Sequence, residues 1–192
     1  MAAPKEDWQQ ERARVLAQAR VVVVKVGSAV LTDANGLSMP VLENLAAQLA
    51  QLRNLMPEST VGVEGGTQPR RLVLVSSGAV AAGRAALSSR GHVVETTGLA
   101  ARQAAAAVGQ GQLMQAWDKV FLAHRMPTAQ VLLTRDDLRA RQRFLNARNT
   151  FAELLEWAVL PIVNENDTVS ISELKFGDND CLASLLDRKS VV

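Results

Sequence analysis

Hydrophobic positions along the chain form short continuous runs, separated by longer segments in which apolar residues recur at helical spacing. Short apolar runs bounded by polar residues or glycine are typical of strands in a parallel sheet. We therefore predict four strands, at residues 20–26, 71–75, 127–133 and 159–163. The first run is rich in valine, so we expect a strand buried on both faces and interrupted near its end by Lys25.

Between these runs, apolar residues recur every three or four positions, which predicts amphipathic helices. The predicted helices cover residues 40–56, 79–88, 99–125 and 144–158. The third contains Gly109 and Gly111, and each glycine costs about 1 kcal/mol relative to alanine inside a helix. Towards the two ends we expect a polar lead-in helix within residues 1–19 and a helix at 178–187.

Two irregular segments complete the pattern. Glycine and proline predict a loop at residues 57–70, and weak alternation predicts a small hairpin at 168–176. Strands that alternate with helices predict an α/β fold around a mainly parallel sheet. The sequence contains no internal repeat and no recognisable linker, and 192 residues suffice for one domain with its own core.

The amino-acid composition argues against several classes of protein. A net charge of +2 and the absence of tyrosine argue against nucleic acid as a partner. No apolar run has the length of a membrane span, and residues 1–19 lack the apolar core of a signal peptide. The single Cys181 fits a reducing cytoplasm, and two histidines argue against a histidine-based metal site. We therefore expect a cytoplasmic protein that binds neither nucleic acid nor a membrane.

Polar residues gather after the last predicted strand. Asn164 to Asp167 follow it directly, and Asp178 to Asp180 come after Gly177. Open α/β sheets bind ligands at the carboxyl ends of their strands. Carboxylates can hold an ammonium group and amides can donate to a carboxylate, so these types together suit an amino acid. Asx turns and helix caps use the same residues, with Asp178 as an N-cap, and could explain either cluster alone.

Two glycine turns suggest a second ligand, which carries phosphate. Lys25 precedes Gly27 and Ser28 at the end of the first strand, and Ser77 and Gly78 follow the second. Glycine lets the backbone approach a phosphate, and helix N-termini attract anions. Either turn alone could be an ordinary strand-to-helix connection. Together with the polar clusters, the turns suggest phosphoryl transfer to an amino acid, whose carboxylate is already ionised and needs no general base.

Seven segments resemble the glutamate 5-kinases, the members of the amino acid kinase superfamily that start proline synthesis. The resemblance extends from about Arg20 to Leu186, and the pair Asn-Glu-Asn-Asp and Gly-Asp-Asn-Asp is specific to this family. The segments are Val24-Lys-Val-Gly-Ser-Ala-Val-Leu31, Val75-Ser-Ser-Gly-Ala-Val-Ala-Ala-Gly83, Ala106-Ala-Val-Gly-Gln110, Leu133-Thr-Arg135, Arg143-Phe-Leu-Asn-Ala-Arg148, Ile162-Val-Asn-Glu-Asn-Asp167 and Lys175-Phe-Gly-Asp-Asn-Asp180.

The resemblance implies a three-layer αβα sandwich and a reaction. In that reaction the γ-phosphoryl group of ATP, with Mg²⁺, passes to the γ-carboxylate of L-glutamate and gives L-glutamyl 5-phosphate. The implied catalytic residues are Lys25, near the transferring group, and Asp180, which organises the catalytic lysines. The implied glutamate-binding residues are Ser77, Asp167, Asn179, Asn164 and Asp178. The implied phosphate-binding positions are Lys25, Gly27, Ser28 and Gly78.

The resemblance also predicts the organisation of the chain. Residues 1–19 would be a lead-in, and residues 20–192 the glutamate-binding part of an amino acid kinase domain, without the C-terminal half that supplies most of the ATP site. It implies a homo-oligomer and proline as a feedback inhibitor. Two alternatives remain open: a non-catalytic amino-acid-binding or regulatory module, and a kinase for another carboxylate such as aspartate. The Gly-Asp-Asn-Asp segment favours glutamate.

Overall fold

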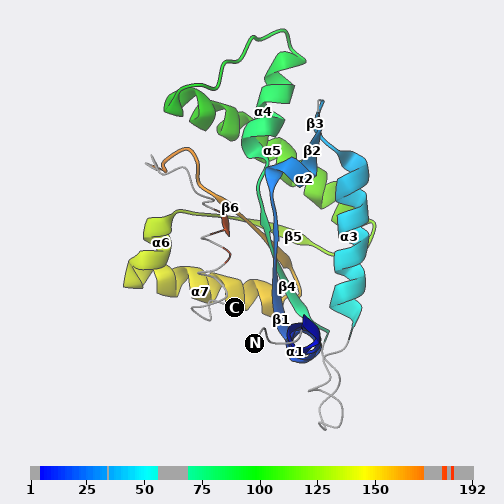
Figure 1. Cartoon of the computed structure of the whole chain (residues 1–192). Helices are drawn as coiled ribbons and strands as arrows, with labels where there is room; N and C mark the ends of the chain where they lie inside the picture. Colours follow the sequence, from blue (N-terminus) through cyan, green and yellow to red (C-terminus); the bar gives the residue numbers. More distant parts are fainter. Residues whose placement is uncertain (1–4, 34, 56–68, 171–178, 181–182, 184–192) are drawn as a thin grey trace.

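The computed structural model describes residues 5–33, 35–55, 69–170, 179–180 and 183 (Figure 1). Several predictions concern residues outside these ranges: most of the loop at 57–70, most of the hairpin at 168–176, Asp178 with its capping role, and Cys181. Of the helix predicted at 178–187, the described residues 179, 180 and 183 are helical. No described helix combines the length and the apolar composition that crossing a lipid bilayer requires.

A four-stranded parallel sheet forms the centre of the described fold, in the strand order β1-β4-β6-β5. The strands are β1 (Val21–Val26), β4 (Arg71–Ser76), β5 (Thr128–Leu133) and β6 (Leu160–Glu165). All four correspond to predicted strands. Because they are parallel, their carboxyl ends lie at one edge of the sheet, so residues far apart in sequence meet there.

Helices cover both faces of this sheet. Leu72 and Leu74 of β4 belong to a core shared with α3 (Met39–Asn54) and α5 (Leu99–Leu122). Val73 and Val75 point the other way, into a core shared with α6 (Arg135–Arg139) and α7 (Arg141–Glu156). Figure 1 shows α3 and α7 on opposite sides of the strands. The strand alternation thus builds two cores, and the predicted three-layer αβα arrangement is confirmed.

The prediction that the first strand is buried on both faces is wrong. Among the described strands β1 pairs only with β4, and its valines from Val21 to Val24 are half-buried. Lys25 keeps 33% of its side chain exposed, so it does not interrupt a buried strand. Valine is favoured on half-buried strands as well as on fully buried ones, and composition alone does not distinguish the two.

The last predicted strand is longer than its apolar run. β6 continues through Asn164 and Glu165, and both side chains are buried. Their backbones pair with Leu132 and Leu133 of β5, so the strand register extends into the polar segment. The polar cluster therefore begins inside the sheet, where its side chains need hydrogen-bond partners.

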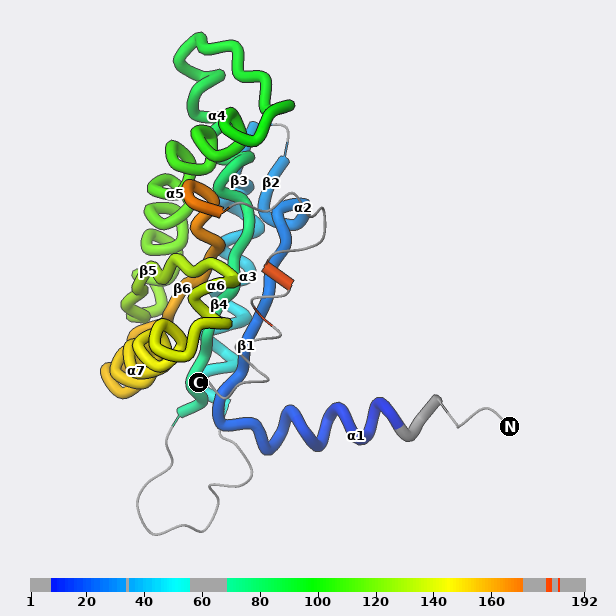
Figure 2. Tube along the Cα trace, turned by 90° about the vertical axis from the view of Figure 1, so that its left-hand side faces the viewer, coloured from blue at the N-terminus to red at the C-terminus, as the bar shows by residue number. Residues whose placement is uncertain are grey.

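The sequence pattern missed three short elements after β1: α2 (Ser28–Leu31), β2 (Thr32–Asp33) and β3 (Gly36–Leu37), in addition to the short α6. None is long enough to produce a periodic signal. The lead-in helix is confirmed as α1 (Lys5–Gln18), which Figure 2 shows running away from the sheet. Arg70 holds the C-terminal end of α1, because its guanidinium donates to the carbonyl oxygens of Leu16 and Ala17 at 2.9 and 3.0 Å.

The helices α4 (Ala79–Ser88) and α5 pack with their backbones in direct contact. A Cβ atom at Gly83 would lie 1.8 Å from the carbonyl oxygen of Ala105, and one at Gly109 would lie 1.9 Å from that of Ala79. Nothing lies within 4 Å of such an atom at Gly111. Gly109 is therefore required for the close approach of the two helices. Gly111 has no such role, so it only lowers the stability of the helix relative to alanine.

Helix α6 begins with a capping box between Thr134 and Asp137. The Asp137 carboxylate accepts from the Thr134 backbone N–H at 2.7 Å and from the Thr134 hydroxyl at 2.6 Å. Burial raises the pKa of Asp137, but these hydrogen bonds and the Arg143 guanidinium outweigh it, so the pKa lies below its ordinary value. The folded state therefore favours the ionised carboxylate.

We expect Asp137→Asn to lower the free energy of unfolding by about 0.5–1.5 kcal/mol at pH 7, since the neutral amide can still accept from Thr134 but loses the negative charge that strengthens these bonds and pairs with Arg143. Because the pKa of the Asp137 carboxyl group is lower in the folded state, this group stabilises the protein at pH values above its unfolded pKa. The stabilisation is lost as the pH falls through the folded pKa. The deficit should therefore shrink below about pH 4, near the ordinary aspartate pKa. Urea unfolding at pH 7 and pH 3 measures this. Asp136→Asn, in the same helical turn, is the control, and a deficit that is independent of pH would contradict the assignment.

Candidate functional site

The predicted site residues that the structure describes gather at the carboxyl ends of β1, β4 and β6. Lys25 and Gly27 come from the end of β1, Ser77 from the residue after β4, and Asn164 from the end of β6. Residues 179–180 return to the same edge from the C-terminal part of the chain, as the contacts of Asn179 show. The fold therefore brings together segments that are more than 100 positions apart.

A lysine–aspartate pair forms one side of this edge. The Lys25 Nζ lies 2.7 Å from Asp180 Oδ1. The same ammonium group curves over Gly27, where an added Cβ would lie 3.4 Å from Nζ. Both side chains remain accessible, Lys25 by 33% and Asp180 by 64%. The pair is thus a cation held over an open backbone turn, and it can reach a ligand from solvent.

Four polar side chains form a continuous chain across the sheet edge. Asn179 Nδ2 donates to Ser77 Oγ at 2.8 Å and to Asn164 Oδ1 at 3.0 Å. Asn164 Nδ2 donates in turn to Gln110 Oε1 on α5, at 2.8 Å. Asn164 Oδ1 also accepts from the backbone N–H of Glu165 at 2.9 Å. These bonds satisfy the buried Asn164, which explains how an amide is tolerated inside β6.

Two atoms of this chain are buried without a partner among the described residues: Asn179 Oδ1 and Gln110 Nε2. The first is an acceptor and the second a donor. An unpartnered buried polar atom costs about 1–3 kcal/mol, and a ligand that carries both a donor and an acceptor would remove this cost. An amino acid carries an ammonium donor and a carboxylate acceptor.

Asp167 lies beside this chain. It is half-buried and lines a cavity of about 290 Å³, together with Gln110 and Glu165. Glu165 is 6% exposed and accepts a hydrogen bond from the Ser170 hydroxyl. The adjacent Asn166 accepts from Thr168 Oγ1 at 2.6 Å, a local turn of the kind expected for this segment. Asp167 and Asn166 both line this cavity, and Asn166 also stabilises the turn.

The two glycine turns differ in geometry. Gly78 has φ 115°, in the left-handed region, and is the N-cap of α4, so the turn after β4 depends on glycine. Ser77 N donates to Val26 O at 3.0 Å, which ties this turn to the end of β1. Ser28 is exposed at the start of the four-residue α2, where its carbonyl oxygen accepts from Thr32. Together, the turns place the start of a ten-residue helix next to Lys25 and Gly27.

Sequence reasoning did not single out Gln110 or Trp117 as members of the site. Gln110 lay within a segment that carries the family resemblance, but only the packing of α5 shows that it meets Asn164. Trp117 is fully buried and donates to Ser76 Oγ at 2.9 Å, which holds the end of β4 against α5. Asp178 lies outside the described residues.

The chain matches the model of the family described as "Amino acid kinase family" over residues 20–186. It is 57% identical over 180 residues to a protein named glutamate 5-kinase from Nitratidesulfovibrio vulgaris (strain DP4), covering 94% of this chain and 43% of that protein. It is 56% identical over 180 residues to a glutamate 5-kinase from Oleidesulfovibrio alaskensis, with the same two coverages.

A glutamate 5-kinase from Geobacter sulfurreducens is 46% identical over 176 residues, which are 91% of this chain and 43% of that protein. The chain thus spans less than half the length of the curated relatives it matches. The family match covers all four strands of the described sheet and both polar clusters. The chain belongs to the amino acid kinase family.

Proposed function

We propose that this chain provides the acceptor side of a glutamate 5-kinase, which transfers the γ-phosphoryl group of ATP to the γ-carboxylate of L-glutamate. The observation that carries the proposal is the polar chain at the sheet edge, with one unpartnered acceptor on Asn179 and one unpartnered donor on Gln110. These are the complements of an ammonium and a carboxylate. The similarity to proteins named glutamate 5-kinase supports glutamate as the amino acid that bears them.

For glutamate binding we propose five residues: Ser77, Asn164, Asp167, Asn179 and Asp178. Asp167 supplies negative charge on the wall of a cavity, which suits the substrate ammonium. Ser77 and Asn164 hold Asn179 by hydrogen bonds and so fix the direction of its free oxygen. The role of Asp178 rests on the family resemblance alone.

For phosphoryl transfer we propose that Lys25 stabilises negative charge on the transferring group. Asp180 orients that lysine through the 2.7 Å contact. Gly27 and Gly78 leave the backbone open to phosphate oxygens, and Ser28 adds a hydroxyl at the start of α2. The substrate carboxylate is ionised at neutral pH, so catalysis consists of alignment and charge stabilisation without a general base.

The geometry near Lys25 fits the phosphates of ATP, since a Cβ at Gly27 would occupy space next to the ammonium group. The described residues contain no group of three acidic or histidine side chains arranged to hold a metal ion. We propose that Mg²⁺ is held mainly by ATP phosphates, as is usual for this ion. When bound, it would neutralise phosphate charge during transfer.

Three wider features follow from the family resemblance, and we propose them on that ground. The protein would act in the cytoplasm, associate as a homo-oligomer and respond to proline as a feedback inhibitor. Sedimentation of the full-length protein would test whether it forms a homo-oligomer. Steady-state rates measured with and without proline would test the feedback inhibition.

The activity is tested on the full-length protein with ATP, Mg²⁺ and either L-glutamate or L-aspartate. Hydroxylamine traps an acyl phosphate as a hydroxamate, which separates transfer to a carboxylate from simple ATP hydrolysis. We expect hydroxamate with glutamate and at least tenfold less with aspartate. Equal rates with both acids would favour a different amino acid kinase, and amino acid binding without any product would favour a non-catalytic binding module.

Replacing Asp167 by asparagine should raise the glutamate KM about tenfold to a hundredfold, with the ATP KM little changed. The reason is the loss of a charge-assisted hydrogen bond to the substrate, worth about 1.5–3 kcal/mol. Steady-state kinetics with each substrate varied in turn measure both constants. Glu153→Gln, on the exposed face of α7, removes a carboxylate far from the site and is the control. An unchanged glutamate KM would remove Asp167 from the binding site.

A further inference from the structure

A second cavity lies at the opposite edge of the sheet, where the strands begin. Its volume is about 170 Å³, and its walls include Leu72 near the start of β4, Leu160 at the start of β6 and Met126 just before β5. These three side chains are buried and form part of the core between the sheet and α3. The cavity is therefore separated from the candidate glutamate site by the length of the strands.

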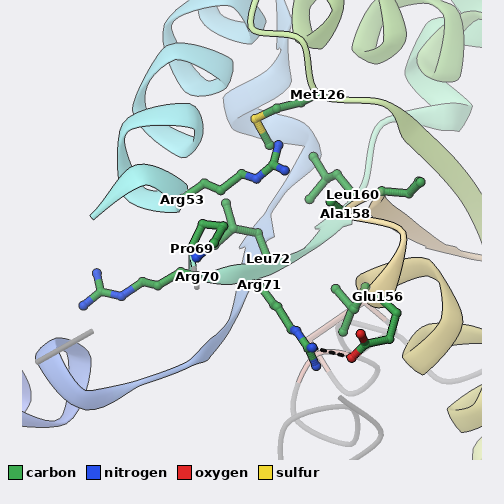
Figure 3. Close-up of a pocket in the computed structure, with 11 residues that line it drawn as sticks. Arg53, Pro69, Arg70, Arg71, Leu72, Met126, Glu156, Ala158 and Leu160 are labelled. Atoms are coloured by element: carbon green, nitrogen blue, oxygen red, sulfur yellow. Dashed lines mark hydrogen bonds and ion pairs between the residues drawn. The ribbon is translucent and has the colours of Figure 1, made fainter. Parts of the chain in front are cut away.

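One charged group projects into this apolar space. Arg53, in the last turn of α3, extends towards Met126, Leu72 and Leu160 (Figure 3). It is half-buried, and no ion pair or side-chain hydrogen bond joins its guanidinium to any described residue. A guanidinium that loses contact with water is usually paired with an acid or with hydrogen-bond acceptors.

The other charged residues of the lining are already engaged. Arg71 pairs with Glu156, the only acidic residue among the described residues of the lining, and Figure 3 shows their contact. Arg70 points away from the cavity and donates to the end of α1. Among the described lining residues, three arginines against one glutamate leave an excess of positive charge, and Arg53 is the cation that faces the apolar walls.

We propose that this cavity binds a small organic carboxylate whose apolar body packs on Leu72, Met126 and Leu160 and whose carboxylate pairs with Arg53. Arginine presents two parallel N–H groups that match a carboxylate. The cavity is similar in volume to an apolar protein cavity of about 150 Å³ that accommodates benzene. A ring or a short branched chain with one carboxylate therefore fits both the size and the charge.

Binding is tested by calorimetric titration of the full-length protein with benzoate, in the presence of saturating L-glutamate so that the candidate glutamate site is occupied. We expect saturable binding of one benzoate per chain. Arg53→Met keeps the length and apolar character of the side chain and should weaken binding about tenfold to a hundredfold, because a charge-assisted pair is lost. Arg148→Met, on an exposed part of α7, should leave binding unchanged.

Two further probes separate the contributions of charge and apolar contact. Inorganic phosphate lacks the apolar body and benzyl alcohol lacks the charge, so both should bind at least tenfold more weakly than benzoate. Absence of benzoate binding, equal binding of phosphate, or unchanged affinity in Arg53→Met would each overturn the proposal. If Arg53 only stabilises the end of α3, the variant would melt at lower temperature and yet bind benzoate normally. Benzoate binding does not depend on phosphoryl transfer, so a failure of the proposed reaction would leave this result unchanged.

Discussion

Replacing Lys25 by alanine in the full-length protein should lower kcat about a hundredfold to a thousandfold, with a much smaller change in the glutamate KM. The lysine would act on charge that develops during phosphoryl transfer, so its loss should affect the rate more than ground-state binding. Its Nζ lies over the open turn at Gly27 and is oriented by Asp180 at 2.7 Å. Steady-state kinetics separate the two constants.

The Lys25 experiment has two companion variants. Lys25→Arg keeps the charge but should also lose most of the rate, because a planar guanidinium does not replace a compact ammonium beside Gly27. Lys119→Ala removes an exposed lysine from the last turn of α5 and should retain full activity. Since Lys25 and Asp180 are both accessible, breaking their pair should change stability by less than about 1 kcal/mol. A near-normal kcat in Lys25→Ala would make the lysine a structural residue.

Replacing Gly109 by alanine should lower the free energy of unfolding by about 3 kcal/mol or more, towards the upper end of the range for overpacked cores. The added Cβ would lie 1.9 Å from Ala79 O and 2.2 Å from Gly83 N. Both are backbone atoms, so α4 and α5 would have to separate. Urea unfolding followed by circular dichroism measures the change.

Gly111→Ala is the matched control for that experiment. It lies two residues further along the same helix and meets nothing within 4 Å, so it should stabilise the protein by about 0.5–1 kcal/mol. Gly83→Ala should behave like Gly109→Ala, because its Cβ would lie 1.8 Å from Ala105 O. Equal effects at Gly109 and Gly111 would contradict the close helix contact. Separation of the helices should also shift Gln110 from Asn164, and so weaken glutamate binding.

Local sequence patterns determined the long elements and the fold class. The valine-rich and leucine-rich runs become four parallel strands, and the segments of helical spacing become α3, α4, α5 and α7. These elements are predictable because periodicity is a local property that many residues repeat. Short elements such as α2, β2 and β3 contain too few residues for such a signal, and sequence reasoning missed them.

Side-chain chemistry in the sequence also identified much of the candidate site. Lys25, Ser77, Asn164, Asn179 and Asp180, which the sequence and its family resemblance proposed as site residues, lie at the edge where the parallel strands end. The inference works because the strand direction in an α/β fold fixes which ends converge. Lys25 was expected to be a buried charge, but it is accessible at the end of β1.

Burial and long-range pairing were decided by the tertiary structure alone. Which strand is central depends on the neighbours it acquires, so similar apolar runs became the half-buried β1 and the fully buried β6. Gln110 meets Asn164, Gly109 meets Ala79, and Arg53 faces an apolar cavity only because distant segments pack together. A sequence gives the chemistry of each side chain, but the packed fold decides which hydrogen-bond partner that side chain meets. At Asn179 Oδ1 the fold provides no partner among the described residues.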